Sequence, residues 1–234
     1  MRALVRSIAI EGQGQVEALI QSVAEEGGTS TKALTEMVRD QTLGAALRSN
    51  VCWLIARTKS PEASTVLLEL LSDPSEQVRE EAAVGIGLVV SSDVEEVGAQ
   101  DDAVQRLLLA VDHDPSKPVR LASLHALGMI GSPTSATGLL EVLHNPGEDA
   151  EVRADAAEAC AHLRDNRIVD ALITVLADGS PIVRYSAAYA LGEQGDVKAI
   201  PMLTELASRD DATTKWGSVA SSAAQAIQSL ASRH

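Results

Sequence analysis

The chain has 234 residues, with 19 basic against 33 acidic side chains and a formal net charge of −14. Hydrophobic residues make up 45%, enough for a packed core, whereas aromatic residues make up 2% and phenylalanine is absent, so the core must consist of Leu, Val, Ile and Ala. The acidic balance argues against nucleic-acid binding and against docking on anionic membranes, because both need a basic surface.

Targeting and redox signals point to the cytoplasm. The longest apolar stretch, residues 82–90, is far shorter than the roughly 20 residues that span a bilayer. Arg6 and Glu11 interrupt the N-terminal apolar residues before the core of a signal peptide could form. Cys52 and Cys160 are too few for a disulfide framework or a zinc site. We therefore expect a cytoplasmic, reduced protein in which both cysteines lie on apolar helical faces.

The N-terminal region predicts a divergent repeat. Residues 2–10 are typical of a capping helix, residues 16–24 of a first helix and residues 32–38 of a second helix. Residues 1–42 thus form a divergent N-terminal repeat or cap.

A ten-residue pattern then recurs through the rest of the chain. An apolar residue is followed by Arg, with small residues four and five positions after the apolar one, and the last copy is degraded. The copies start at Leu47, Val78, Val119, Val152, Val183 and Val219. The longest spacing, between the second and third copies, indicates an acidic insertion at residues 91–102.

Each copy predicts two helices. In the copy from Val183, Ala187 and Leu191 continue one apolar stripe of period 3.6, and small residues in this stripe let neighbouring helices approach closely. Glycine-containing turns such as residues 192–196 end the first helix, and Pro181 stands at a helix start. A single helix pair cannot bury both apolar stripes, so the copies must stack into an all-α superhelix.

These residues resemble a known family. An Asp turn followed by V-R-x-x-A-A-x-A-L-G is the pattern of the short HEAT-like repeats of the phycobilisome-lyase type, and residues 183–192 match it almost letter for letter. The resemblance covers about residues 43–230 and implies a HEAT-like α-solenoid of stacked helical hairpins. We expect one domain, with repeats at about 43–214 and a C-terminal capping helix at 215–234. Such repeats occur in scaffolds, lyases, hydroxylases and DNA-repair proteins, so the resemblance implies architecture rather than activity.

The resemblance also implies a ladder of bonds between neighbouring repeats, from the Arg of each pattern to a turn Asp. Because the feature recurs in every repeat, packing between repeats explains it more simply than anion binding does. We therefore expect these bonds to be structural. The residues concerned are Asp73, Asp114 and Asp178 with Arg48, Arg79, Arg120, Arg153 and Arg184.

Enzymatic motifs do not stand out. The glycine pairs at 12–14 and 85–87 lack the third glycine of a dinucleotide turn. The five histidines form no H-x-x-x-H spacing and no His-Glu pair, which a similarity to the hydroxylase branch would require. We expect no catalytic residue, no metal ligand and no cofactor. The aromatic residues are too scattered for base stacking, although Tyr185 and Tyr189 share a helix side, and we expect both to pack against a neighbouring repeat.

The second helices supply the candidate partner-binding residues, because they line the inner, concave side in the family that the chain resembles. Equivalent positions in successive second helices are Glu36, Glu69, Leu109, Glu141, Thr174 and Glu205. Residues one turn away share the same helix side: Thr65, Ser72, Gln105, Asp112, Thr137, His144, Asp170, Ala177, Pro201 and Ser208. A repeated Glu would focus negative potential in a groove, but an ordinary solvated surface would show the same residues.

The favoured function is a non-catalytic scaffold or adaptor. We expect a monomer, because the terminal repeats lack the Arg and resemble caps. Its partner would be a protein, with a basic segment as the favoured chemistry and neither nucleic acid nor membrane involved. The alternative is a bilin-lyase-like subunit or chaperone acting on a chromophore-carrying protein. The insertion at 91–102, interpreted first as a solvated loop, and the convex side remain alternative contact surfaces.

Overall fold

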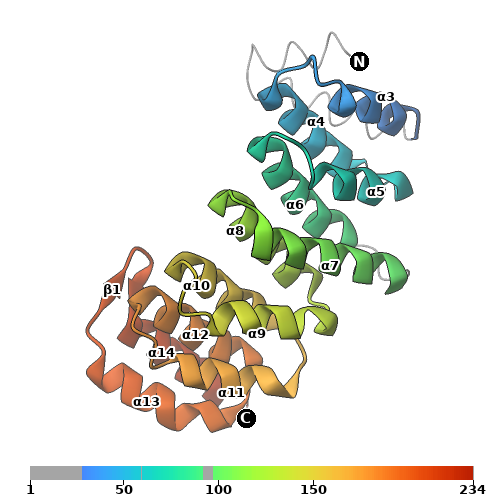
Figure 1. Ribbon diagram of the computed structural model, residues 1–234. Coiled ribbons are helices and arrows are strands. Elements are labelled where there is room, and N and C mark those ends of the chain that lie inside the picture. Colours follow the sequence, from blue (N-terminus) through green and yellow to red (C-terminus); the bar gives the residue numbers. More distant parts are fainter. Residues whose placement is uncertain (1–27, 59, 92–96, 234) are drawn as a thin grey trace. The chain divides into compact units, whose positions relative to one another are not determined.

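The computed structural model describes residues 28–58, 60–91 and 97–233. The helices predicted at 2–10 and 16–24 lie outside these residues. The described residues form twelve α-helices, three short 3₁₀ helices and one small two-stranded hairpin, so the fold class is all-α, as predicted (Figure 1). The chain divides into two compact units, residues 1–126 and 127–234, and each is described by itself.

The described residues of unit 1 form first and second helices in alternation. They are α3 (Gly28–Arg39), α4 (Ala45–Arg57), α5 (Pro61–Leu70), α6 (Glu76–Val90), α7 (Val97–His113) and most of α8 (Lys117–Ile130). The first helices α4 and α6 pack against each other, and α3 and α5 pack alongside them. Ile55, Leu67 and Ile86 are fully buried in the resulting core. The second helix predicted at 32–38 is confirmed by α3.

Unit 2 repeats the same arrangement. Its elements are η1 (Pro133–Ser135), α9 (Ala136–His144), α10 (Ala150–Ala159), η2 (Cys160–His162), α11 (Asn166–Val175), α12 (Pro181–Gln194), η3 (Val197–Ala199), α13 (Ile200–Arg209), β1 (Thr213–Thr214), β2 (Gly217–Ser218) and α14 (Val219–Ser232). The first helices α10, α12 and α14 pack in a row, while α9, α11 and α13 lie against them as second helices (Figure 1).

Small residues allow the first helices of unit 2 to pack closely, as predicted. A Cβ added at Gly192 of α12 would lie 2.9 Å from Cα of Ala226 on α14, so a larger residue there would force the helices apart. Three residues later, Gly195 adopts a φ of 81° as the left-handed C-cap that ends α12.

Two segments differ from the sequence-based expectation. Residues 97–102, predicted as part of a solvated loop, form the first turns of α7, so this part of the insertion lengthens a second helix. The C-terminal helix begins at Val219 rather than at residue 215, because Thr213 pairs with Ser218 and Thr214 with Gly217 in the β1–β2 hairpin.

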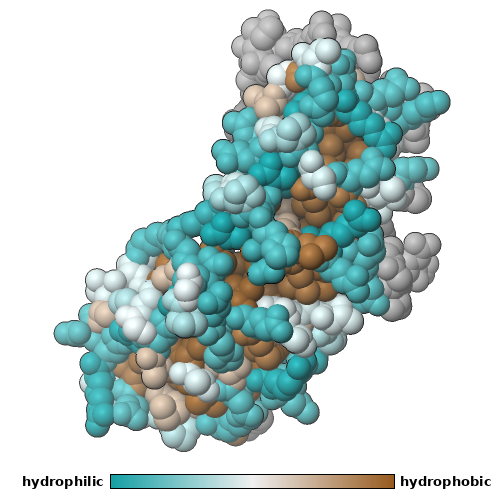
Figure 2. Space-filling model, viewed as in Figure 1, coloured by the Kyte–Doolittle hydropathy of each residue, from teal (hydrophilic) through white to brown (hydrophobic). Residues whose placement is uncertain are grey.

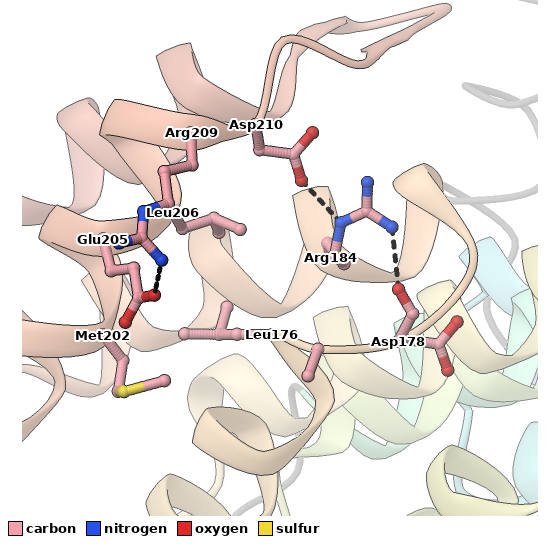
Figure 3. Close-up of a pocket in the computed structure, with 9 residues that line it drawn as sticks. Leu176, Asp178, Arg184, Met202, Glu205, Leu206, Arg209 and Asp210 are labelled. Carbon is pink, nitrogen blue, oxygen red and sulfur yellow. Dashed lines mark hydrogen bonds and ion pairs between the residues drawn. The ribbon is translucent and has the colours of Figure 1, made fainter.

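The turns between repeats are joined by arginine side chains, and Arg184 shows the geometry. Its Nε donates to Oδ2 of Asp210 at 2.6 Å, and its Nη1 donates to the backbone oxygen of Asp178 at 2.7 Å (Figure 3). The two acceptors lie in the turns that precede consecutive first helices. A single guanidinium therefore ties two successive repeats of unit 2 together.

Arg79 makes the same connection in unit 1. Its Nε donates to Oδ2 of Asp114 at 2.6 Å and its Nη1 to the backbone oxygen of Asp73 at 2.9 Å. Arg48 likewise donates through both terminal nitrogens to the carboxylate of Asp73. This last pair is the most enclosed, since the Arg48 side chain is 4% exposed and the Asp73 side chain 2%.

The two remaining arginines of the predicted ladder, Arg153 and Arg120, also bind turn aspartates. Arg153 donates through Nη2 to both carboxylate oxygens of Asp178, at 3.0 and 3.2 Å. Arg120 donates through Nη1 to the backbone oxygen of Asp114 at 3.1 Å. Asp210 was not among the residues expected from the sequence, because it stands nine rather than five positions before the next apolar start.

Three turn carboxylates, those of Asp73, Asp114 and Asp210, have a pKa below the ordinary value. Burial raises the pKa of Asp73, but hydrogen bonds from Arg48 and from the Ser75 N–H outweigh it and bring the pKa below its ordinary value. The carboxyl of Asp114 shows the same balance, with Arg79 as its main partner. For Asp210, the hydrogen bond from Arg184 is the largest cause of the lowered pKa. Ionised aspartates are thus part of the folded state.

Removing the charge of Asp73 should destabilise the chain strongly. Asp73→Asn leaves the buried Arg48 guanidinium without its counter-ion, which costs on the order of 3–5 kcal/mol. The matched control is Asp102→Asn, which breaks the half-exposed ion pair with Arg106 and should cost less than about 1 kcal/mol. Urea unfolding of both variants measures the difference, and equal losses would contradict a structural role for the Arg48–Asp73 pair.

Stability should also depend on these carboxylates in acid. Because the folded pKa values of Asp73, Asp114 and Asp210 are lowered, their contribution is complete above the unfolded carboxyl pKa of about 4. The contribution is lost as the pH falls through the lowered folded values. The difference in unfolding free energy between wild type and Asp73→Asn should therefore shrink below about pH 4. A difference that stays constant throughout this acid range would contradict the linkage.

Candidate interaction surface

The second helices of unit 1 leave one side uncovered by packing. Glu36 on α3, Glu69 on α5 and Leu109 on α7 occupy equivalent positions and are all exposed. Leu109 is 58% exposed, which is unusual for a large apolar side chain in a helix that also carries core residues. Their predicted neighbours on the same side are also exposed: Thr65, Ser72, Gln105 and Asp112.

Unit 2 shows the same uncovered side. Glu141 on α9, Thr174 on α11 and Glu205 on α13 are exposed at the equivalent positions. Their neighbours on this side are exposed as well: Thr137, His144, Asp170, Ala177, Pro201 and Ser208. We call these exposed positions, described separately in each unit, the second-helix side.

Basic side chains neutralise part of the negative charge on the second-helix side. In unit 1, Arg39 of α3 forms an ion pair with Glu69 of the next second helix. In unit 2, Arg209 pairs with Glu205 one turn earlier, and Lys198 Nζ lies 2.9 Å from Oδ1 of Asp170. These pairs are exposed and each contributes at most about 1 kcal/mol, so a stronger cationic ligand could replace them.

Two glutamates of the second-helix side lack a basic partner among the described residues. Within the part of the chain that the structure describes, neither Glu36 nor Glu141 takes part in an ion pair. The second-helix side therefore carries free carboxylates at one position in each unit, alongside the paired ones. The net negative charge of this side is therefore smaller in magnitude than the number of its glutamates alone would indicate.

A groove lies between consecutive second helices in unit 1. It has a volume of about 600 Å³ and lies between α3 and α5. Glu36 and Arg39 line it from α3, and Thr65 and Val66 from α5. The groove thus combines a free carboxylate with an apolar side chain of the opposite helix.

A second groove, of about 460 Å³, lies in unit 2 between α13 and the turn that follows α11, and Arg184 of α12 also lines it. Leu176 and Leu206 lie between the Glu205–Arg209 pair and the Arg184–Asp210 pair (Figure 3). In each unit, apolar residues show at the surface between hydrophilic ones (Figure 2). An apolar floor with charged walls can hold an extended peptide through one apolar side chain and its charged neighbours.

The two cysteines are not available for chemistry at the surface. Cys52 and Cys160 are both free and buried, as expected from the sequence. Burial raises the pKa of the Cys52 thiol far above its ordinary value and that of Cys160 to about 12. Both thiols therefore stay protonated and unreactive at neutral pH.

The described residues hold neither a metal-binding cluster nor a helix that could cross a membrane. Between residues 28 and 233, leaving out 59 and 92–96, His, Cys, Asp and Glu side chains do not gather in threes that could hold a metal ion. Over this part of the chain, every helix is too short or too polar to cross a bilayer.

Comparison with known proteins agrees with this architecture. Residues 137–231 match the family model of HEAT repeats. No curated protein sequence matches the chain.

Solved structures are similar to nearly the whole chain in fold. YibA of Escherichia coli is 18% identical with a TM-score of 0.60, covering 98% of this chain and 92% of that one. A designed armadillo repeat protein is 17% identical with a TM-score of 0.54, covering 85% and 98%. The complex of CpcE and CpcF of phycocyanin lyase from Nostoc sp. is 19% identical with a TM-score of 0.50, covering 97% and 93%. Residues 137–231 therefore match the HEAT repeat family, and the fold of the chain is similar to that of other helical repeat proteins.

Proposed function

We propose that the chain is a non-catalytic scaffold that binds a segment of a partner protein on its second-helix side. The observation that carries this proposal is that equivalent positions of every described second helix are exposed, while the apolar residues of these helices are buried. The regular packing of the repeats therefore leaves one side open in α3, α5 and α7 of unit 1 and in α9, α11 and α13 of unit 2. Repeat proteins commonly use such a surface, made of short modules, to hold extended ligands.

A basic segment with apolar residues suits the chemistry of this side best. The free carboxylates of Glu36 and Glu141 attract cations, and Glu69 and Glu205 already hold arginines. Leu176 and Leu206 line the groove between α13 and the turn after α11, and Val66 lines the α3–α5 groove, so each groove has apolar as well as charged lining. Charge would govern the association rate and partner choice, whereas apolar contacts would supply much of the affinity.

The buried thiols support a role without covalent chemistry. Cys52 and Cys160 are enclosed in helix packing, so they cannot attach a chromophore or attack a substrate without local unfolding. The similar structure from Nostoc sp. is a complex of CpcE and CpcF. A HEAT-like fold of this size is therefore compatible with assembly on a protein partner.

Charge reversal on the second-helix side tests the proposal. The variant combines Glu36→Lys, Glu141→Lys and Glu205→Lys, and the probe is a fluorescein-labelled peptide of alternating Lys, Leu and Arg residues. Fluorescence anisotropy at low salt should show at least about tenfold weaker binding to the variant, because three attractive contacts become repulsive. Binding to the wild type should also weaken as salt is added.

A control variant separates local from overall charge. Glu76→Lys, Glu80→Lys and Asp211→Lys change the net charge equally at exposed positions outside the second helices. This control should bind the peptide as the wild type does. If both variants lose the same affinity for the peptide, the attraction is non-specific and the proposed surface is wrong. If the wild type binds a peptide with Glu in place of Lys and Arg as tightly as the basic peptide, the choice of a basic partner is overturned.

A further inference from the structure

Three of the four aromatic side chains gather on one surface of unit 2, away from the second-helix side. Trp216 occupies the turn of the β1–β2 hairpin and stacks on Tyr185 of α12, with ring centroids 6.3 Å apart and planes inclined by 27°. Tyr189 lies one helical turn further along α12 on the same side. We call Trp216, Tyr185 and Tyr189 the aromatic row.

The hairpin holds Trp216 in an ordered but exposed position. The backbone N–H of Trp216 donates to Oγ1 of Thr214 at 3.1 Å, and the hydroxyl of Tyr185 donates to the Trp216 oxygen at 3.4 Å. Gly217 has a φ of 139°, which the tight turn requires. Trp216 nevertheless remains 49% exposed and Tyr189 44% exposed. Tyr189 is therefore only partly covered by its neighbours, and part of its ring is open to solvent.

Carboxylates lie beside the aromatic row. Glu158 on α10 accepts a hydrogen bond from Ser186 Oγ at 2.7 Å, next to Tyr185 in the chain. Burial, followed by the charges of Glu193 and Glu158, raises the pKa of the Tyr189 hydroxyl. Glu193 also holds Arg233 at 3.4 Å, so Glu158 is the better placed of the two to accept a cation from outside.

At one end of the aromatic row, a lysine of the chain already contacts an aromatic ring and a carboxylate. Lys215 Nζ lies 4.3 Å from the centroid of the Trp216 ring and 3.2 Å from Oε1 of Glu151 on α10. An aromatic face and a neighbouring carboxylate thus already hold an ammonium group. Among the residues that the structure describes, cations lie over the rings of Trp53 and Trp216, whereas the ring of Tyr189 has none.

We propose that the aromatic row and Glu158 form a second docking surface, which takes an arginine side chain of a partner protein. The planar guanidinium stacks on the exposed ring of Tyr189 while it donates hydrogen bonds to the Glu158 carboxylate. Trp216 provides a neighbouring apolar platform for the residue next to that arginine. This surface belongs to the first helices and the hairpin, so it stands independently of peptide binding on the second-helix side.

Nuclear magnetic resonance titration of the full ¹⁵N-labelled chain tests this assignment. The probe is a short glycine peptide carrying two arginines, and the reference is the same peptide with citrulline, which keeps the shape but lacks the charge. The arginine peptide should shift the Trp216 indole N–H and the amides of residues 185–193, whereas the citrulline peptide should not. Shifts confined to α9, α11 and α13 would support the second-helix side and overturn this proposal.

Point variants sharpen the test. Tyr189→Leu and Glu158→Gln should each weaken binding of the arginine peptide by about three- to thirtyfold, in line with a cation–π contact or a charged hydrogen bond. Trp53→Phe, an aromatic change in unit 1, is the matched control and should leave the affinity unchanged. Urea unfolding establishes that all three variants remain folded. Unchanged affinity in folded Tyr189→Leu would overturn the proposal, and equal binding of a lysine peptide would overturn the choice of guanidinium.

Discussion

The ion pair between a repeat's arginine and the turn aspartate of the next repeat is the interaction on which each unit depends. Arg79 and Arg184 each bind a backbone oxygen in their own turn and a carboxylate in the following one. Two neighbouring turns therefore cannot move relative to one another without breaking hydrogen bonds of a largely buried guanidinium. Since an unpaired buried charge is costly, this connection fixes the register of the repeats more sharply than apolar packing alone.

The register of the turns determines which helix surfaces are covered. First helices pack against the first helices of neighbouring repeats, and residues such as Gly192 bring them close together. Second helices use their apolar stripe on the first helices and leave the opposite side in solvent. The same repeat geometry thus produces both the core and the second-helix side, and grooves lie between α3 and α5 in unit 1 and between α13 and the turn after α11 in unit 2.

Much of this could be predicted because the repeat is periodic. Aligning the copies assigns each residue a position, and that position predicts that Glu36, Thr174 and Glu205 face solvent. Periodicity does not predict contacts that belong to one repeat alone. The pairing of Arg39 with Glu69 depends on side-chain reach across 30 positions, and Asp210 lies outside the regular turn spacing.

The hairpin was missed for a related reason. Residues 213–218 replace the usual turn in a single copy, and strands of two residues carry no recognisable alternation. The stacking of Trp216 on Tyr185, 31 positions away, follows only once that hairpin is folded. Aligning the repeats therefore cannot predict structures that occur in one copy only. In this chain, the exposed aromatic row is such a structure.

Site-specific photo-crosslinking tests the central claim, that the second-helix side holds the partner segment. A benzoylphenylalanine placed at Thr174 on α11 is compared with one at Gln225, an exposed position on α14 of the same unit. With the Lys-, Leu- and Arg-containing peptide, the position on α11 should crosslink and the position on α14 should not. Crosslinking from α14 alone, or equally from both positions, would contradict the assignment of the binding surface.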